Sequence, residues 1–188
     1  MNIDTKYSLD WIKNKYDQGD EMKFIYFWGN TEKGGEVTKT CMSQWYGSAF
    51  TVDGVVYKTA EHWMMGKKAL LFNDEEIFNK IILSNKPGEV KALGREVRNY
   101  SEERWLAHRY AIVVEGNIHK FGQNPALKEF LLNTGSRILV EASPVDQIWG
   151  IGMAQDHQDI ADPHAWRGPN LLGFALMEAR DYLRAHNS

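Results

Sequence analysis

The dipeptide Asp53-Gly54 most constrains the fold, because it separates two β-prone runs, residues 49–52 and 55–58. A two-residue type I′ turn requires positive φ at both central positions, and Asp-Gly meets that requirement. The sequence therefore predicts a β-hairpin at about residues 49–58.

Helical signals dominate the remainder of the chain. Ser, Thr or Asn residues stand where helices begin, and prolines open two further segments. The expected helices cover about residues 8–18, 60–72, 73–83, 87–98, 102–121, 124–133 and 170–186, and short strands are expected at 23–28 and 137–141. Because strands and helices do not alternate regularly, we expect an α+β fold. It should be a single compact, mainly helical domain over residues 1–188, with a small β-sheet that includes the hairpin.

The composition narrows the possible partners. The net charge of -3 comes without a basic stripe, which argues against sequence-independent binding of nucleic acid. A single cysteine, Cys41, rules out a disulfide within the chain; it is typical of a buried residue, with a catalytic thiol as the alternative. The N-terminal residues lack the apolar segment of a signal peptide, and no apolar run reaches the ~20 residues that a bilayer requires. We expect a cytoplasmic protein that does not enter membranes.

The expected helix after the hairpin places Glu61 and Lys68 on one face, two turns apart, among Met and Phe side chains. A buried charge needs a partner or a function. Each residue could pair with a distant charge, or the two could line a pocket in which Glu61 handles a proton and Lys68 holds an anion. Burial would raise the pKa of Glu61 and its place in the first helical turn would lower it, and the sequence leaves that balance open.

Two further features could contribute to a site. Trp105 and Arg109 are four residues apart on one helix, so they could stack on a base and grip a phosphate, or serve as a core tryptophan and a surface arginine. Asp146 precedes Trp149-Gly150-Ile151-Gly152, where glycines permit close backbone approach and Gly150 could help to bind an anion.

Metal binding is not indicated. The acidic and histidine residues between Asp156 and His164 match no zinc or calcium spacing, so we expect no metal site.

Many segments in order resemble the YbiA-like family of the NADAR superfamily, from about residue 24 to the C-terminus. They are Tyr26–Gly29, Cys41–Tyr46, Thr59–Ala69, Pro87–Arg98, Trp105 with Arg109, Lys120–Gly135, Leu139–Gly152 and Gly168–Arg180. Residues 42–46 read Met-Ser-Gln-Trp-Tyr where many relatives have a Leu-Ser-Asn-Phe-like run, which is a variant of the pocket rim. The resemblance divides the chain into an N-terminal extension, 1–22, and a core, 23–188.

The resemblance implies an N-glycosidase that hydrolyses phosphoribosylamino-pyrimidine intermediates of riboflavin biosynthesis and releases ribose 5-phosphate. It implies pocket roles for Glu61, Lys68, Trp105, Arg109, Asp146, Trp149 and Asn170. Glu61 and Asp146 are the expected catalytic residues, no cofactor is required, and the partner is a small phosphoribosyl or ADP-ribosyl substrate.

Two alternatives stay open. One is an ADP-ribosyl glycosidase that acts on guanine, so that nucleic acid enters only as a modified substrate. The other is a binding module for ADP-ribose or a nucleotide that performs no catalysis. The presence of both Glu61 and Asp146 favours an enzyme, because a pure binder of a phosphosugar has less need of carboxylates near anions.

Overall fold

The computed structural model describes residues 5–31 and 34–186, so residues 1–4 of the predicted extension lie outside the described residues. In chain order the elements are α1 (Leu9–Asp17), β1 (Phe24–Phe27), the 3-10 helix η1 (Lys39–Met42), β2 (Phe50–Val52), β3 (Val55–Tyr57), α2 (Ala60–Leu71), α3 (Glu75–Leu83), α4 (Pro87–Leu93), α5 (Glu102–Gln123), α6 (Pro125–Asn133), β4 (Ile138–Glu141) and α7 (Leu171–Ala185). The expected α+β class is confirmed.

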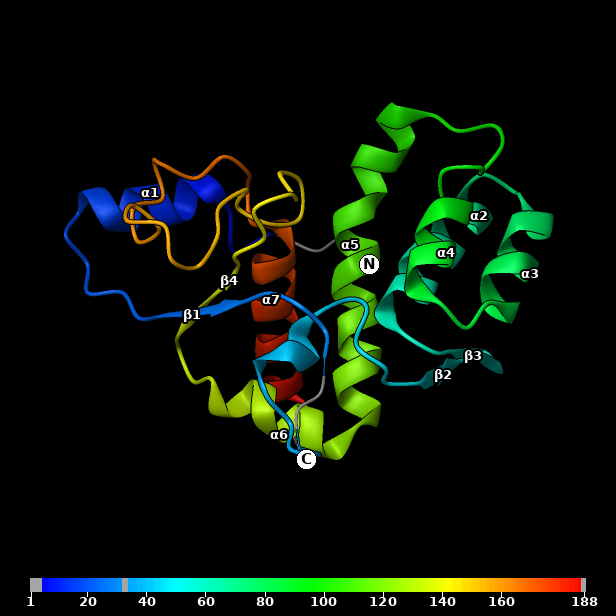
Figure 1. Ribbon diagram of the computed structural model, residues 1–188, viewed down its shortest axis with the longest axis horizontal. Helices are drawn as coiled ribbons and strands as arrows, with labels where there is room; N and C mark the ends of the chain where they lie inside the picture. Colours follow the sequence, from blue (N-terminus) through cyan, green and yellow to red (C-terminus); the bar gives the residue numbers. More distant parts are fainter. Residues whose placement is uncertain (1–4, 32–33, 187–188) are drawn as a thin grey trace.

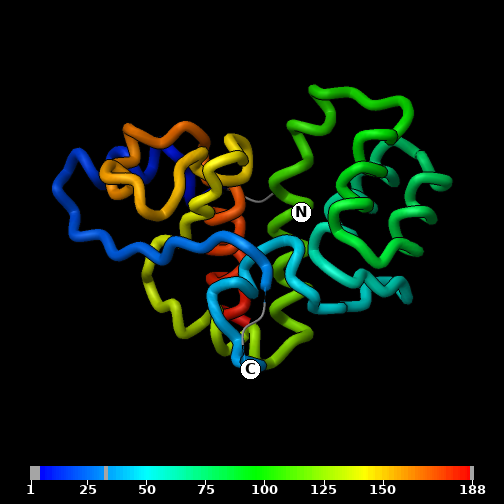
Figure 2. Tube along the Cα trace, viewed as in Figure 1, coloured from blue at the N-terminus to red at the C-terminus, as the bar shows by residue number. Residues whose placement is uncertain are grey.

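The long helices α5 and α7 pack against each other in the middle of the molecule (Figure 1). Helices α2, α3 and α4 lie on the α5 side, and β1 and β4 lie on the α7 side. Figure 2 shows the same arrangement along the Cα trace, with α7 in red beside α5 in green. In the parts of the chain that the structure describes, no helix combines the length and the apolar composition that crossing a membrane requires.

The four described strands form two separate pairs. Strands β1 and β4 are parallel, with Phe24 opposite Ile138 and Phe27 opposite Glu141. Strands β2 and β3 form the expected antiparallel hairpin, and φ is 50° at Asp53 and 79° at Gly54. Phe50 and Tyr57 of the hairpin pack with Trp63 of α2 in a separate aromatic cluster, and the two hairpin strands form a sheet of their own.

Two expected helix caps are confirmed and one is corrected, while the side chains of Asn124 and Asn170, which precede α6 and α7, make no capping bond. The side chains of Thr59 and Ser101 accept hydrogen bonds from the backbone of α2 and α5, as the sequence predicts. Helix α3 is capped by Asp74, whereas Asn73, the expected start, has a left-handed φ of 57°. The Asp74 carboxylate accepts the capping bond from the Ile77 N–H at 3.3 Å and a second bond from the Arg98 backbone N–H at 2.9 Å.

Asn170 joins the start of α7 to strand β4. Its Nδ2 donates to the Leu139 carbonyl at 2.9 Å, and its Oδ1 accepts from the Glu141 N–H at 3.0 Å. The side chain is fully buried and the backbone is left-handed, with φ of 56°. A Cβ atom at Gly173 would lie 2.0 Å from the Leu139 carbonyl oxygen, so glycine is needed for this close approach. These contacts fix the end of β4, where Glu141 is located.

We expect Asn170→Ala to destabilise the fold strongly, because it leaves two buried backbone groups of β4 without partners. Asn99→Ala is the matched control, since Asn99 is exposed and has the same φ of 56°. Beyond the backbone strain that both variants share, Asn170→Ala should lose about 2–4 kcal/mol of unfolding free energy in urea denaturation. Equal losses in the two variants would contradict the role of the amide.

Candidate functional site

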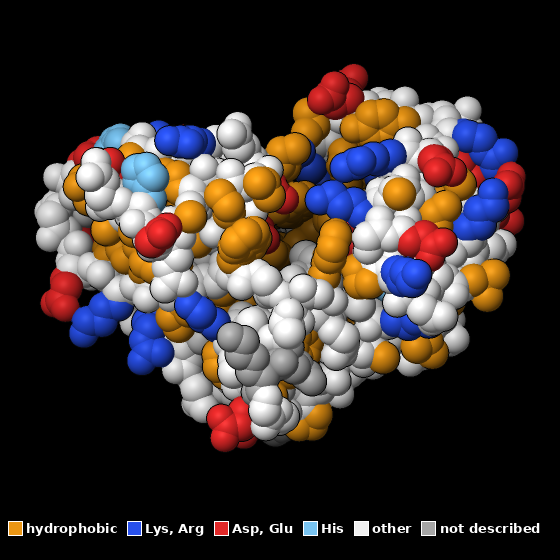
Figure 3. Space-filling model, in the orientation of Figure 1, with side chains coloured by type: hydrophobic (Ala, Val, Ile, Leu, Met, Phe, Trp, Pro, Cys, Tyr) orange, Lys and Arg blue, Asp and Glu red, His pale blue; other side chains and the backbone are white. Residues whose placement is uncertain are grey.

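A pocket of about 500 Å³ opens between α2 and α4 on one side and the ends of β1 and β4 on the other. In Figure 3 this face is hollowed between two lobes, with Lys and Arg side chains along one wall and Asp and Glu side chains inside the hollow. The lining includes Phe27, Trp28, Ser43, Gln44, Trp45, Glu61, Met64, Met65, Lys68, Lys91, Arg95, Trp105, Glu141, Asp146, Trp149 and Leu172.

Five of the residues that the sequence singled out line this pocket together: Glu61, Lys68, Trp105, Asp146 and Trp149. Arg109 lies beside it, with its guanidinium carbon 5.9 Å from the ring centroid of Trp149. Gly150 and Asn170 are buried outside the described lining. A Cβ atom at Gly150 would come within 2.8 Å of the Glu141 carbonyl oxygen. Gly150 and Asn170 therefore support the residues that line the pocket and are not part of its lining.

Glu61 lies in the first turn of α2, where its backbone N–H donates to the Gln44 carbonyl at 2.9 Å. The residue is only 3% exposed, and its Oε1 has no hydrogen-bond partner among the described residues. Burial raises the pKa of Glu61 to about 7, against the opposing effects of the Lys91 charge and a hydrogen bond from Trp45. Burial thus decides the balance that the sequence left open, and both protonation states are accessible near neutral pH.

Glu141 is half-buried at the end of β4 and brings a second carboxyl group to the pocket. The sequence analysis placed it in a strand but gave it no role. Burial raises its pKa to about 8, and the negative charges of Asp146 and Glu61 add to the effect. Its Oε2 also has no hydrogen-bond partner among the described residues. A glutamate that ends an otherwise buried apolar strand, Ile-Leu-Val-Glu, is the signal that could have identified it.

Asp146 has a structural task in addition to its place in the lining. Its Oδ1 accepts hydrogen bonds from the backbone N–H groups of Ile148 at 2.9 Å and Trp149 at 2.8 Å. Its own N–H donates to Ser143 Oγ at 3.2 Å. The carboxylate therefore folds the loop that carries Trp149 into the pocket.

The cations of the pocket come from α2 and from α4 with the turn after it. Lys68 Nζ donates to the Gly94 carbonyl at 2.7 Å and lies 5.6 Å from the ring centroid of Trp105. Burial lowers the pKa of Lys68. Lys91 and Arg95 also line the pocket, and neither was among the site residues that the sequence predicted. Their spacing of four residues was the available signal.

Lys120 lies in the core and binds the backbone of a segment that lines the pocket. It is fully buried, and its Nζ donates to the backbone carbonyls of Cys41 at 2.6 Å and Ser43 at 2.8 Å. These bonds fix the segment that carries Trp45, the hydrogen-bond donor to Glu61. Burial lowers the pKa of Lys120 to about 7 and raises that of the Cys41 thiol to about 11. Cys41 is therefore protonated near neutral pH, which fits a structural residue better than a nucleophile.

The pocket thus combines proton-transfer groups with anion-binding groups. Two carboxyls with raised pKa values, Glu61 and Glu141, can exchange protons near neutral pH. The cationic side chains can hold a phosphate, and the tryptophans can stack on a flat ring. Within residues 5–31 and 34–186, no group of three or more His, Cys, Asp or Glu side chains is arranged to hold a metal ion.

We expect Trp45→Phe to raise the pKa of Glu61 further above about 7, because the substitution removes an indole hydrogen bond that stabilises the ionised carboxyl. A ¹³C NMR titration of the glutamate side-chain carboxyls measures this change. Trp28→Phe serves as the control, because Trp28 lines the same pocket at its exposed rim. An unchanged or lowered pKa in Trp45→Phe would show that the indole does not stabilise the carboxylate.

The chain matches a known domain family and is similar to several known proteins. The NADAR domain matches residues 26–184. "N-glycosidase R617" of Acanthamoeba polyphaga mimivirus is 42% identical over 164 residues, which cover 85% of this chain and 95% of that protein. "Riboflavin biosynthesis protein VVA0006" of Vibrio vulnificus is 29% identical over 86% of this chain and 39% of its own length.

The fold is also found in a solved structure. The NMR structure of the E. coli protein YbiA superimposes with a TM-score of 0.69 at 24% sequence identity, covering 88% of this chain and 87% of YbiA. The family match extends over most of the chain and includes every residue that lines the pocket. The chain belongs to the NADAR domain family.

Proposed function

We propose that this chain is an N-glycosidase that hydrolyses the bond between a phosphorylated ribose and the amine of a pyrimidine-type base, releasing ribose 5-phosphate. The observation that carries the proposal is the buried Glu61 carboxyl, with one oxygen unpartnered among the described residues, in a pocket that also holds Lys68, Lys91 and Arg95. A substrate with a cationic reacting centre and an anionic end matches both features.

Hydrolysis of such a bond requires two proton transfers. The electron pair of the broken C1′–N bond stays on the amine nitrogen, which takes up a proton, while a water oxygen bonds to C1′ and loses one. Positive charge develops on the sugar during this step, and a nearby carboxylate stabilises it. Glu61 has the lower pKa and suits the base that activates water, and Glu141 has the higher pKa and suits the acid that protonates the leaving amine.

The other lining residues suit the remaining parts of the substrate. Lys68, Lys91 and Arg95 would hold the phosphate, with Arg109 adding charge beside Trp149. Trp45 and Trp105 would flank the base, and Asp146 would orient the sugar hydroxyls or the water. The name of the mimiviral relative supports the bond type, and that of the Vibrio relative supports a substrate from riboflavin biosynthesis.

The direct test is hydrolysis of 5-amino-6-(5-phosphoribosylamino)uracil, followed by release of ribose 5-phosphate. Glu61→Gln should lower kcat by about 10²–10⁴-fold and leave substrate affinity nearly unchanged, because only proton transfer and charge stabilisation are lost. The control is Glu75→Gln, an exposed glutamate in the first turn of α3, which should keep wild-type rates.

No release by folded wild-type protein would refute the phosphoribosylamino-pyrimidine substrate. Cleavage of ADP-ribosylated guanine in the same assay would then assign the pocket to the ADP-ribosyl alternative. Binding without turnover of either compound would assign it to a binding module.

The proposed roles predict a bell-shaped dependence of kcat/KM on pH. Activity should rise as pH passes about 7, because Glu61 must be ionised to act as a base, and fall above about 8, because Glu141 must be protonated to act as an acid. Glu141→Gln should lower the rate and remove the alkaline fall. An alkaline fall that persists in Glu141→Gln would assign the acid to another group.

A further inference from the structure

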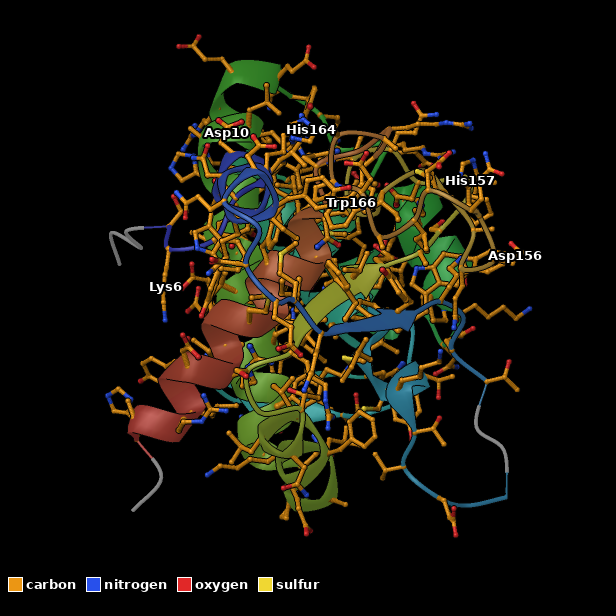
Figure 4. All side chains as sticks on the ribbon, turned by 90° about the vertical axis from the view of Figure 1, so that its left-hand side faces the viewer. Lys6, Asp10, Asp156, His157, His164 and Trp166 are labelled. Atoms are coloured by element: carbon orange, nitrogen blue, oxygen red, sulfur yellow. The ribbon has the colours of Figure 1, made fainter. Side chains whose placement is uncertain are left out.

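A second cavity, of about 650 Å³, lies between α1, the residues just before β1, and α7. It shares no lining residue with the candidate active site. Half of its lining comes from residues 6–23, which precede the segment that the NADAR domain matches. Figure 4 views the molecule from this side, and the labelled Lys6 lies at the edge beside α7.

The described lining is strongly cationic. It contains five basic side chains and two acidic ones, Glu21 and Asp181. Asp181 is shared by Lys6, at 2.6 Å, and Arg184, at 3.6 Å. Glu21 forms an exposed contact with Lys23 at 3.6 Å. Lys15 pairs with Asp20, which is not part of the lining. Five basic side chains against three acidic ones still leave an excess of positive charge at the cavity.

Arg180 contributes a buried guanidinium to this lining. The residue is 2% exposed, and its Nη1 donates to Thr134 Oγ1 at 2.9 Å and to the Arg137 carbonyl at 2.8 Å. Its Nε has no hydrogen-bond partner among the described residues. The charge of Asp181 and a hydrogen bond with Tyr7 favour the charged guanidinium, and its Nε still has a proton to donate to an acceptor.

Apolar side chains complete the lining, which makes a bare inorganic ion a poor match for the whole cavity. Tyr7 and Trp11 form an edge-to-face pair with ring centroids 4.9 Å apart, and Met22, Ile138 and Met177 lie in the same lining. The volume falls within the range of about 300–1,000 Å³ that is usual for small-molecule sites.

We propose that this cavity is a second binding site, for a phosphorylated small molecule with a flat ring, of the size of a nucleoside monophosphate. The phosphate lies toward Arg180, Arg184 and the lysines, and the ring lies against Trp11 and the methionines. The site depends on the N-terminal extension and is independent of the activity proposed above.

The test is an NMR titration of the full chain with AMP and with UMP, following the indole N–H signals of Trp11 and Trp45. Trp11 reports on this cavity, and Trp45 reports on the candidate active site. We expect a saturable shift of the Trp11 signal with at least one nucleotide. Adenosine, uridine and inorganic phosphate should each bind more weakly than the matching nucleotide, because each uses only part of the lining.

The variant Lys23→Glu with Arg184→Glu should weaken the binding reported by Trp11 by about tenfold or more, because it reverses two charges of the lining. The control, Lys86→Glu with Arg104→Glu, has the same change in net charge at two exposed residues outside this lining, and should bind as the wild type does.

Shifts of Trp45 alone, no saturable shift of Trp11, or equal weakening in both double variants would overturn the proposal. Inorganic phosphate that binds as tightly as both nucleotides would also overturn it, because the aromatic and apolar side chains would then contribute nothing.

Discussion

Two carboxyl groups with raised pKa values, those of the buried Glu61 and the half-buried Glu141, meet in one pocket. Burial raises their pKa values from an ordinary 4.5 to about 7 and about 8. From about pH 4.5 to about pH 8 these two groups hold more protons in the folded chain than in the unfolded chain. The free energy of unfolding therefore falls as pH rises through this range. The fold therefore has to position both groups through contacts with other residues.

Several contacts from distant parts of the sequence perform this positioning. Asn170 links α7 to the β4 backbone next to Glu141, and β1 pairs with the other edge of that strand. Lys120 holds the segment that carries Trp45, and Trp45 hydrogen-bonds Glu61. Cations from α2 and α4 then face a carboxylate-rich wall without neutralising it. This separation of charge suits a substrate that is anionic at one end and becomes cationic at its reacting centre.

Local chemistry made much of the fold predictable. Asp53-Gly54 specified the hairpin, and Thr59 and Ser101 specified the starts of α2 and α5, because these features depend on neighbours in sequence. The pairing of β1 with β4 joins residues more than a hundred positions apart, so no local pattern could predict it. For the same reason the sequence indicated Glu61 and Lys68 on one helix face but missed Glu141 and Lys91, whose roles arise only where separate elements meet. Trp45 was named only as part of the pocket rim, without its hydrogen bond to Glu61. The pocket role of Asn170 was implied by the family resemblance, whereas its hydrogen bonds to β4 join distant segments and cannot be read from the sequence.

The most direct measurement of the central claim is a ¹³C NMR titration of the glutamate side-chain carboxyls in the wild-type protein, with Glu61→Gln and Glu141→Gln to assign the signals. The account predicts that these two carboxyls titrate near pH 7 and pH 8, and that Glu61→Gln lowers the pKa of Glu141 by removing a neighbouring negative charge. Two midpoints near the ordinary value of 4.5, each unaffected by the other substitution, would contradict a buried, coupled pair of carboxyl groups.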